Sequence, residues 1–182
     1  MKSGCRIASL GLLMCIASMV VAQGSNDEGA KNFHIVSLLQ SGNNQHHEEV
    51  NRRGDEAMGF SHAKTTHHFH LMKDGGSIEV SANDAADTES RDQIRHHLAH
   101  IAELFKSGDF SKPEHTHGKL PPGAVEMAKL KSEINYRYQE TERGGRILIS
   151  TKNADALRAV HEFLRFQIED HQTGDPLEVD KN

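Results

Sequence analysis

Two stretches of this chain show the same order of patterns, and this repetition constrains the fold more than any other feature of the sequence. Each stretch has two segments of alternating residues rich in strand formers, separated by a turn that contains Gly-Gly. The turns are Asp74-Gly75-Gly76 and Arg143-Gly144-Gly145. The strands are expected at residues 66–72, 77–82, 134–140 and 146–151. Each stretch therefore predicts a β-hairpin, and chance similarity between two short patterns is the alternative to a true repeat.

An amphipathic helix is predicted after each hairpin. Apolar residues recur every three or four positions over residues 89–106 and again over residues 154–171. Asn153 suits the start of the second helix, because its side chain accepts hydrogen bonds from free backbone N–H groups. The chain is therefore interpreted as two ββα units, joined by a Pro-containing linker and a short helix at about residues 123–132.

Two ββα units predict an α+β fold, in which a four-stranded antiparallel sheet carries the helices on one face. The core is expected from alternate strand residues and from the apolar stripes of the helices. These are Phe69, Leu71, Ile78, Val80, Ile134, Tyr136, Tyr138, Ile147 and Ile149 on the strands, and Ile94, Leu98, Ile101, Phe105, Leu157, Val160, Leu164 and Ile168 on the helices. The expected division is a leader at 1–22, a flexible polar arm at 23–57, one domain at 58–176 with repeats at 65–109 and 134–175, and a tail at 177–182.

The leader has the features of an export signal. Lys2 and Arg6 form a basic start, residues 7–22 are mostly apolar, and small residues before Gln23 suit a signal peptidase. The apolar stretch is short for a transmembrane helix, so an uncleaved anchor is the less favoured alternative. We expect a periplasmic or secreted protein that begins near Gln23 and has no stable membrane insertion.

Both cysteines of the chain, Cys5 and Cys15, lie in this leader. The mature protein would then have no thiol, which excludes cysteine nucleophiles, iron–sulfur clusters and thiolate metal sites. A domain of this size buries enough apolar surface to fold without disulfides. Any bound metal would be held by imidazole, carboxylate or backbone oxygen.

The charge of the chain argues against nucleic acid as a partner. The sequence has 21 basic and 26 acidic residues, and without Lys2 and Arg6 the 19 basic residues leave a formal net charge of −7. No basic stripe stands out. The sequence also lacks a phosphate-binding Gly-rich loop, a Gly-x-Ser-x-Gly elbow and a His-Glu-x-x-His motif.

Histidine is the residue type that points to a function. All 14 histidines follow the leader, and most of those in the predicted domain fall into three groups. The groups are His67, His68 and His70; His96, His97 and His100; His115 and His117. Imidazole is the commonest protein ligand of zinc, copper and nickel. The groups therefore predict a transition-metal site, with buried and hydrogen-bonded histidine as the plainer alternative.

The expected strand and linker each bring histidine toward the core. His67 shares a strand face with Phe69 and Leu71, whereas His68 faces the other way. His117 lies in the expected loop before two consecutive prolines and could close a site next to His67.

The first predicted helix adds a second source of imidazole. His97 falls within its apolar stripe, His100 lies at the border of the stripe, and His96 points toward solvent. Strand, helix and loop would then supply ligands to one metal ion. His161 and His171, on the second predicted helix, each stand alone, and core or helix-end roles are expected for them.

Several blocks of the sequence resemble a family of small exported bacterial proteins. The blocks are Met58-Gly59-Phe60, Thr65-Thr66-His67-His68-Phe69, Gly75-Gly76-Ser77-Ile78-Glu79-Val80, Pro121-Pro122-Gly123, Phe163-Leu164-Arg165-Phe166-Gln167-Ile168, Asp170-His171 and Thr173-Gly174-Asp175. The resemblance covers nearly the whole expected mature chain, and together the blocks are specific. The resemblance implies that His67, His68, His97, His100 and His117 belong to a recurring pattern, and that His70, His96 and His115 are particular to this chain.

The resemblance implies no established activity. Some members of that family carry the name aspartate carbamoyltransferase, but the phosphate-binding Ser-Thr-Arg-Thr segment of that larger enzyme is missing here. We expect an exported histidine-rich protein that binds zinc, copper or nickel through His67, His68, His97, His100 and His117. The alternatives are a small metal-dependent or histidine-based enzyme of unknown substrate, and a non-catalytic module that binds a protein partner or forms a homodimer.

Overall fold

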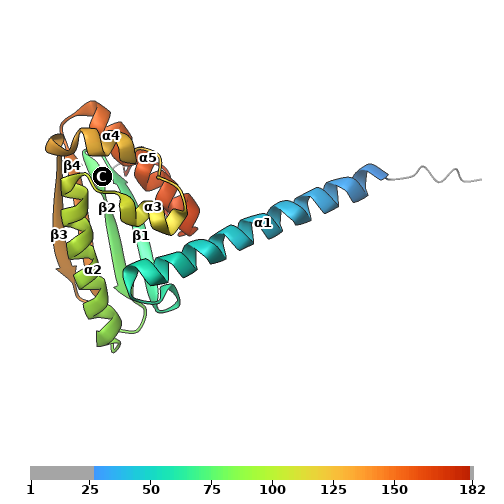
Figure 1. Ribbon diagram of the computed structural model, residues 1–182, viewed down its shortest axis with the longest axis horizontal. Helices are drawn as coiled ribbons and strands as arrows, with labels where there is room; N and C mark the ends of the chain where they lie inside the picture. Colours follow the sequence, from blue (N-terminus) through green and yellow to red (C-terminus); the bar gives the residue numbers. More distant parts are fainter. Residues whose placement is uncertain (1–26, 181–182) are drawn as a thin grey trace, which may run out of the picture. The chain divides into compact units, whose positions relative to one another are not determined.

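The computed structural model describes residues 27–180, so the predicted leader at residues 1–22 lies outside the described part (Figure 1). The chain divides into two compact units, Met1–Leu38 and Leu39–Asn182. The second unit holds all strands of the described chain and the candidate site. The elements are α1 (Asp27–Met58), η1 (His62–Lys64), β1 (Thr65–Met72), β2 (Gly75–Ala82), α2 (Thr88–Ser107), α3 (Ser111–His117), α4 (Ala124–Lys129), η2 (Lys131–Glu133), β3 (Ile134–Thr141), β4 (Gly144–Thr151) and α5 (Ala154–His171).

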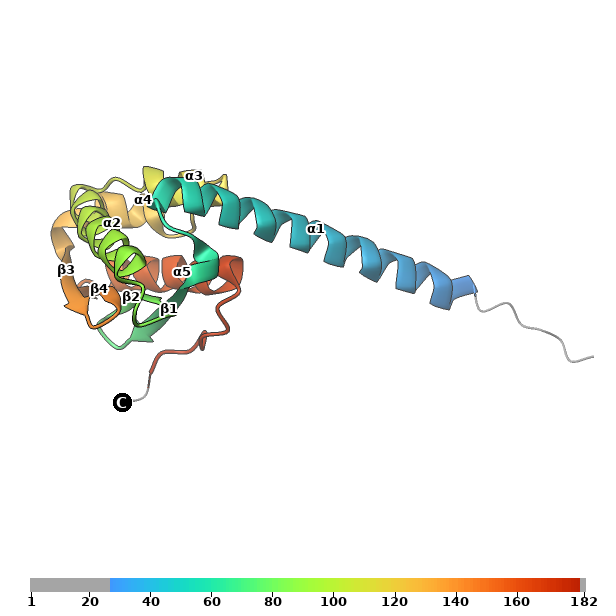
Figure 2. The same ribbon diagram turned by 90° about the horizontal axis from the view of Figure 1, so that it is seen from below.

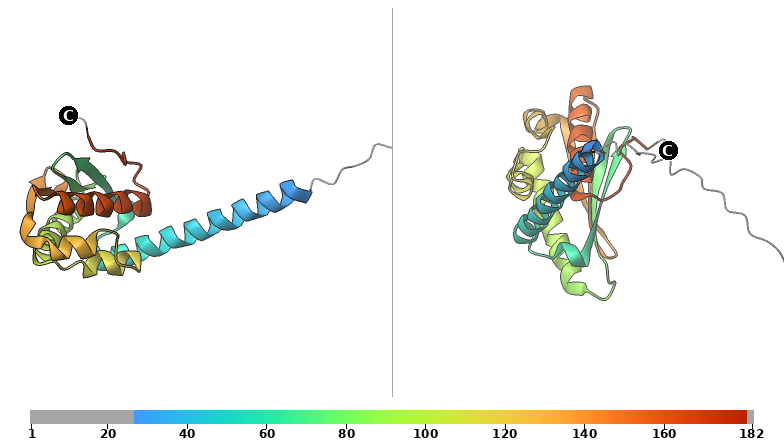
Figure 3. Two further views of the ribbon diagram at one scale, coloured as in Figure 1. Left: turned by 90° about the horizontal axis from the view of Figure 1, so that it is seen from above. Right: turned by 90° about the vertical axis from the view of Figure 1, so that its right-hand side faces the viewer.

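The strands form one four-stranded antiparallel sheet in the order β1-β2-β4-β3. The two hairpins join along β2 and β4, where Ile78 pairs with Ile147 near the centre of the sheet. The helices α2 and α5 pack on the same face of this sheet (Figures 2 and 3). The predicted α+β fold is therefore confirmed, with the element orders β1-β2-α2 and β3-β4-α5.

Each of the helices α2 and α5 covers the hairpin of the other ββα unit. The helix α2 packs mainly on β3 and β4, and α5 packs on β1 and β2. The Gly-Gly pairs allow this close approach, since a Cβ on Gly76 would lie 2.3 Å from Leu164 Cδ1 and one on Gly145 would lie 3.2 Å from Leu98 Cδ1. The crossed packing leaves a space between α2 and α5, above β1 and β2.

The predicted core residues are buried, with two exceptions. Tyr138 and Leu157 are only partly buried. Phe163 on α5 joins the core and packs edge-to-face on Phe105, at 5.7 Å between ring centroids. Both helix ends follow the sequence signals, since Asn153 caps α5 and Gly108 ends α2 in the left-handed conformation.

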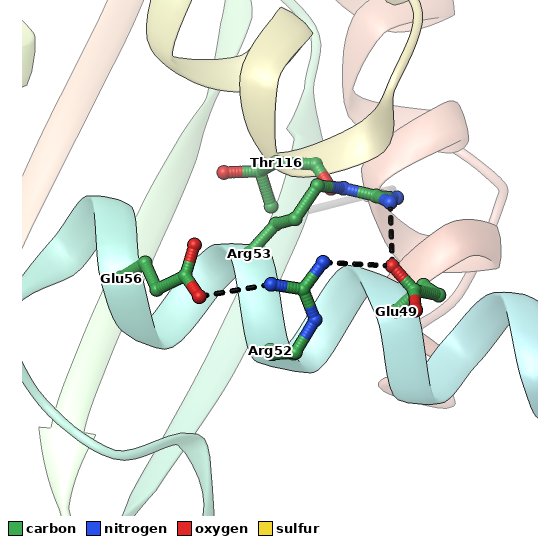
Figure 4. Close-up of polar contacts among 5 residues, drawn as sticks. All are labelled: Glu49, Arg52, Arg53, Glu56 and Thr116. Atoms are coloured by element: carbon green, nitrogen blue, oxygen red, sulfur yellow. Dashed lines mark hydrogen bonds and ion pairs between the residues drawn. The ribbon is translucent and has the colours of Figure 1, made fainter.

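Residues 27–58 are helical, although a flexible arm was expected at residues 23–57. The end of α1 is held by contacts that the polar composition does not reveal. Val50 is fully buried, and the Arg53 Nε–H donates to the Thr116 carbonyl at 2.9 Å. Arg52 bridges Glu49 and Glu56 along the helix, at 2.9 and 2.8 Å (Figure 4).

The segment before the two prolines also differs from expectation, because His117 ends the helix α3 instead of lying in a loop. Pro113 occupies the first turn of α3, where proline is tolerated. The Phe110 ring anchors the start of this helix by stacking on Phe105, with the ring centroids 4.6 Å apart.

Candidate functional site

A cavity of about 80 Å³ lies in the space between α2 and α5. Its walls are mainly apolar side chains of β1, β2, α2 and α5, and α3 and the end of α1 complete its edge. The apolar walls include Phe69, Ile78, Val80, Leu98, Ile101, Phe105 and Phe163. Four histidines also line it, namely His67 of β1, His97 of α2, His117 of α3 and His171 of α5.

The four imidazoles belong to one contiguous group of rings. His67 and His171 are stacked, with ring centroids 5.6 Å apart and ring planes 4° from parallel. His171 meets His117 edge-to-face at 4.9 Å. Phe60 packs against the His97 ring at 5.6 Å and lies 6.4 Å from the His67 ring, so it links the fourth imidazole to the others.

Burial makes these imidazoles neutral near pH 7. Desolvation, supported by neighbouring positive charge, lowers the pKa of both His67 and His97 to about 4. Burial also holds the pKa of His171 well below its ordinary value. A neutral imidazole has one nitrogen lone pair available for a ligand, and no hydrogen bond from the described residues reaches the rings of His67, His97 or His171.

His117 differs from the other three because both of its ring nitrogens have protein partners. Its Nδ1 lies 2.6 Å from Asp170 Oδ2, and the other carboxylate oxygen of Asp170 lies 2.9 Å from His46 Nε2. Burial lowers the pKa of His117 in spite of the adjacent carboxylate. In Asp170, burial is outweighed by the hydrogen bonds of both histidines, which lower the pKa of the carboxyl group.

Gln167 is the least satisfied polar group of the site. Its Oε1 lies 3.0 Å from His117 Nε2, while its Nε2 is buried and has no hydrogen-bond partner. If His117 is neutral and donates through Nδ1 to Asp170, the Gln167 amide must turn over to donate to His117 Nε2. In both arrangements one end of a side chain that is only 5% exposed is left unpaired.

A second, more polar cavity of about 210 Å³ adjoins the first. His67, His171 and Met58 line both cavities. The stacked pair of His67 and His171 therefore stands between an apolar cavity and a polar one. His47 and His62 line only the second cavity, and His62 Nδ1 is paired with Asp55 at 3.0 Å.

The structure gathers part of the predicted ligand set. His67, His97 and His117 line the same cavity, whereas His68 and His100 do not. His68 lies on the outer face of β1, where its Nδ1 is 2.9 Å from Asp175 Oδ1. His100 is exposed on α2.

His171 is the site residue that the sequence analysis did not select. It continues the apolar stripe of α5, since it follows Ile168 by three positions and Leu164 by seven. That spacing was a usable signal. The sequence could not show that the end of α5 lies beside β1 and α3.

The rings do not form a finished coordination site. Within residues 27–180, no group of three or more His, Cys, Asp or Glu side chains is arranged to hold a metal ion. In the same part of the chain, no helix is long and apolar enough to cross a membrane.

Comparisons with protein-family models, with curated proteins and with solved structures find no match to this chain. The resemblance to exported bacterial proteins stays a prediction.

Proposed function

We propose that this protein binds one divalent transition-metal ion at the apolar cavity, through imidazoles drawn from His67, His97, His117 and His171. The observation that supports the proposal is the meeting of four imidazoles from four separate elements at a single cavity. Three of these rings have no hydrogen-bond partner within the described chain. Neutral, unpaired imidazole is the donor that zinc, copper and nickel accept.

The spacing of two ring pairs suits this proposal after side-chain rotations, whereas the His97 ring contacts Phe60 and would have to move toward the other three rings. A histidine nitrogen binds zinc at about 2.0–2.1 Å, so two ring centres on one ion lie no more than about 6.4 Å apart. The centroid distances of 5.6 Å for His67 with His171 and 4.9 Å for His171 with His117 fall within this limit. The near-parallel planes of His67 and His171 must tilt for both nitrogens to point at one ion.

The contact between His117 and Asp170 supports a ligand role for His117. Metal-binding histidines commonly donate their second ring N–H to a carboxylate, which fixes the ring and its tautomer. Asp170 is placed to do this at 2.6 Å from His117 Nδ1. The Nε2 atom would then be released from Gln167 to bind the ion.

The proposed set replaces two of the residues predicted from the sequence. We leave out His68 and His100 because they lie away from the cavity, and we add His171. Variants of the omitted residues are therefore matched controls for those of the proposed ligands.

The test is calorimetric titration of the metal-free protein with zinc, copper and nickel, using protein purified without a histidine tag. We expect about one ion per chain with a dissociation constant below about 10 μM, a free energy near −7 kcal/mol. Failure of all three ions to bind more tightly than this would contradict the proposal.

The place of action that goes with this function is the periplasm or the outside of the cell. It rests on the leader pattern in residues 1–22. N-terminal sequencing of protein from a bacterial envelope fraction should find a start near Gln23. Recovery of intact Met1 from the cytoplasm would exclude export.

A small histidine-based enzyme is the second candidate, and the His117–Asp170 pair favours it. A carboxylate that orients a buried imidazole is also the arrangement of a general base. No side chain of the described cavity wall offers a hydroxyl or thiol nucleophile except Thr116. If the metal site kept an open position that holds water, both candidate functions would apply to the same site.

A further inference from the structure

The cavity has a feature beside His117 that metal binding by the histidines does not explain. Gln167 is among the few buried polar side chains of the core, and one end of its amide is unpaired in either orientation. An unpaired buried amide is costly, so native proteins normally satisfy it with protein, water or a ligand. Gln167 lines the cavity itself, which makes the cavity the place where such a partner would lie.

Water alone is a poor partner for this position. A cavity of about 80 Å³ is several times the space that one water centre needs, about 10–15 Å³. Water away from the histidines, Thr116 and Gln167 would meet mainly carbon, because Ile78, Val80, Leu98, Ile101, Phe105 and Phe163 form the other walls. Each ordered water needs two to four polar partners, and apolar cavities tend to stay dry or to take apolar guests.

We infer that the cavity binds a small, mostly apolar organic molecule with one hydrogen-bonding group, and that Gln167 pairs with this group. The size of the cavity limits the buried part of the ligand to a few heavy atoms, since a cavity of about 150 Å³ holds benzene. Contact with the apolar walls would provide the affinity, and the amide of Gln167 would select ligands with a donor or an acceptor at one end. This inference stands without bound metal.

The experiment uses two five-membered rings of similar size in EDTA-treated protein purified without a histidine tag. Pyrazole has both a hydrogen-bond donor and an acceptor, whereas cyclopentene has neither. Methyl NMR spectra follow Leu98, Ile101 and Val80, which line the cavity, during titration with each probe. The methyl groups of Leu120 and Val125, which are 40% and 52% exposed, serve as the control for non-specific contact.

We expect saturable shifts in the cavity methyl groups and not in the two surface residues. Gln167→Leu should then weaken pyrazole binding relative to cyclopentene binding by about tenfold, the effect of one hydrogen bond. If this variant does not fold, the wild-type protein still gives a test, because bound pyrazole should show nuclear Overhauser effects to the Gln167 amide protons.

Two results would overturn the inference. Absence of saturable shifts with both probes would mean that the cavity holds only water. An unchanged ratio of the two affinities in Gln167→Leu, or bound pyrazole without contact to the amide, would mean that Gln167 selects no ligand. Metal titration of the same sample is independent, so failure here leaves the metal proposal standing, and failure there leaves this inference standing.

Discussion

His67 and His68 are neighbours on β1, but they occupy two very different regions of the molecule. His67 faces the helices, lines the apolar cavity and stacks on His171. His68 faces outward, where its side chain is 47% exposed and pairs with Asp175. This difference shows that one cluster of histidines in the sequence can contain two populations, one that lines the cavity and one that lies on the outer face. Strand alternation sends adjacent residues to opposite faces of the sheet, and only one face meets α2 and α5.

The pH dependence of stability should separate these populations most strongly. Burial lowers the folded-state pKa of His67 and His97 to about 4, below the unfolded value of 6.5. Between these values the unfolded chain binds more protons than the folded chain. The stabilisation is therefore present above pH 6.5 and is lost as pH falls toward 4, by up to about 1.4 kcal/mol per pH unit for each of these two histidines.

Urea unfolding of the metal-free protein from pH 7 to pH 4.5 measures this loss. His97→Leu should flatten the curve, because one protonation site is removed from the cavity. His68→Ala is the matched control for removal of an imidazole outside the cavity. A wild-type stability that does not change over this range would show that the cavity histidines are not held neutral by burial.

Asp170 contacts His117 from outside the cavity lining, so its substitution tests whether His117 is a metal ligand. Asp170→Asn should weaken metal binding by about 10- to 100-fold, since an amide does not orient and polarise His117 as a carboxylate does. Glu169→Gln, at the exposed neighbouring position, is the matched control. Calorimetric titration gives both affinities, and equal affinities would remove His117 from the ligand set.

On α5, His171 and His161 allow a separation of ligand from structural histidine. His161 Nε2 lies 3.0 Å from the carbonyl oxygens of both Met72 and Gly75, which makes it a clamp on the β1–β2 turn. His161→Ala should lower the free energy of unfolding by about 1 kcal/mol and leave metal affinity unchanged. His171→Ala should reduce metal affinity by at least about tenfold, or 1.4 kcal/mol. The reverse pattern in titrations and urea unfolding would exchange the two roles.

The smallest effect is expected on the outer face of the sheet. His68→Ala removes an exposed pair with Asp175, and such pairs contribute about 0–1 kcal/mol. Asp175 keeps the Phe69 backbone N–H and the Thr173 hydroxyl as donors at 2.9 and 2.7 Å, so the segment after α5 should stay in place. Unchanged metal titration is the expected result, and a tenfold loss of affinity would restore His68 to the ligand set.

Local patterns in the sequence were sufficient to predict most of the fold. Strand alternation and the Asn153 cap fix elements over a few residues, and the structure has these elements at nearly the predicted positions. The Gly-Gly pairs were expected in the turns, but they are the first residues of β2 and β4. The arm and the segment before the two prolines were predicted less well, whereas the short helix expected at about residues 123–132 is α4. Helices α1 and α3 depend on distant contacts, such as Arg53 with Thr116 and Phe110 with Phe163.

The candidate site was only partly predictable for a related reason. Strand alternation predicted that His67 faces the core, and the apolar stripe of the helix predicted the same for His97; both line the cavity. They could not show that α2 and α5 each cover the hairpin of the other unit, which brings His171 beside His67. The unpaired amide of Gln167 could not be predicted either, since the sequence does not show which hydrogen-bond partners a buried glutamine has.

The central claim is that burial toward the cavity, and not the mere presence of histidine, defines the metal ligands. His97 and His96 are adjacent on α2, yet only His97 lines the cavity. The most direct measurement is a set of thermal melts of His97→Ala and His96→Ala with and without zinc, copper or nickel. We predict that His97→Ala loses most of the metal-dependent rise in melting temperature, with binding at least about tenfold weaker, and that His96→Ala keeps it. A His97→Ala protein that is less stable but responds fully to metal, or an equal loss in both variants, would contradict the account.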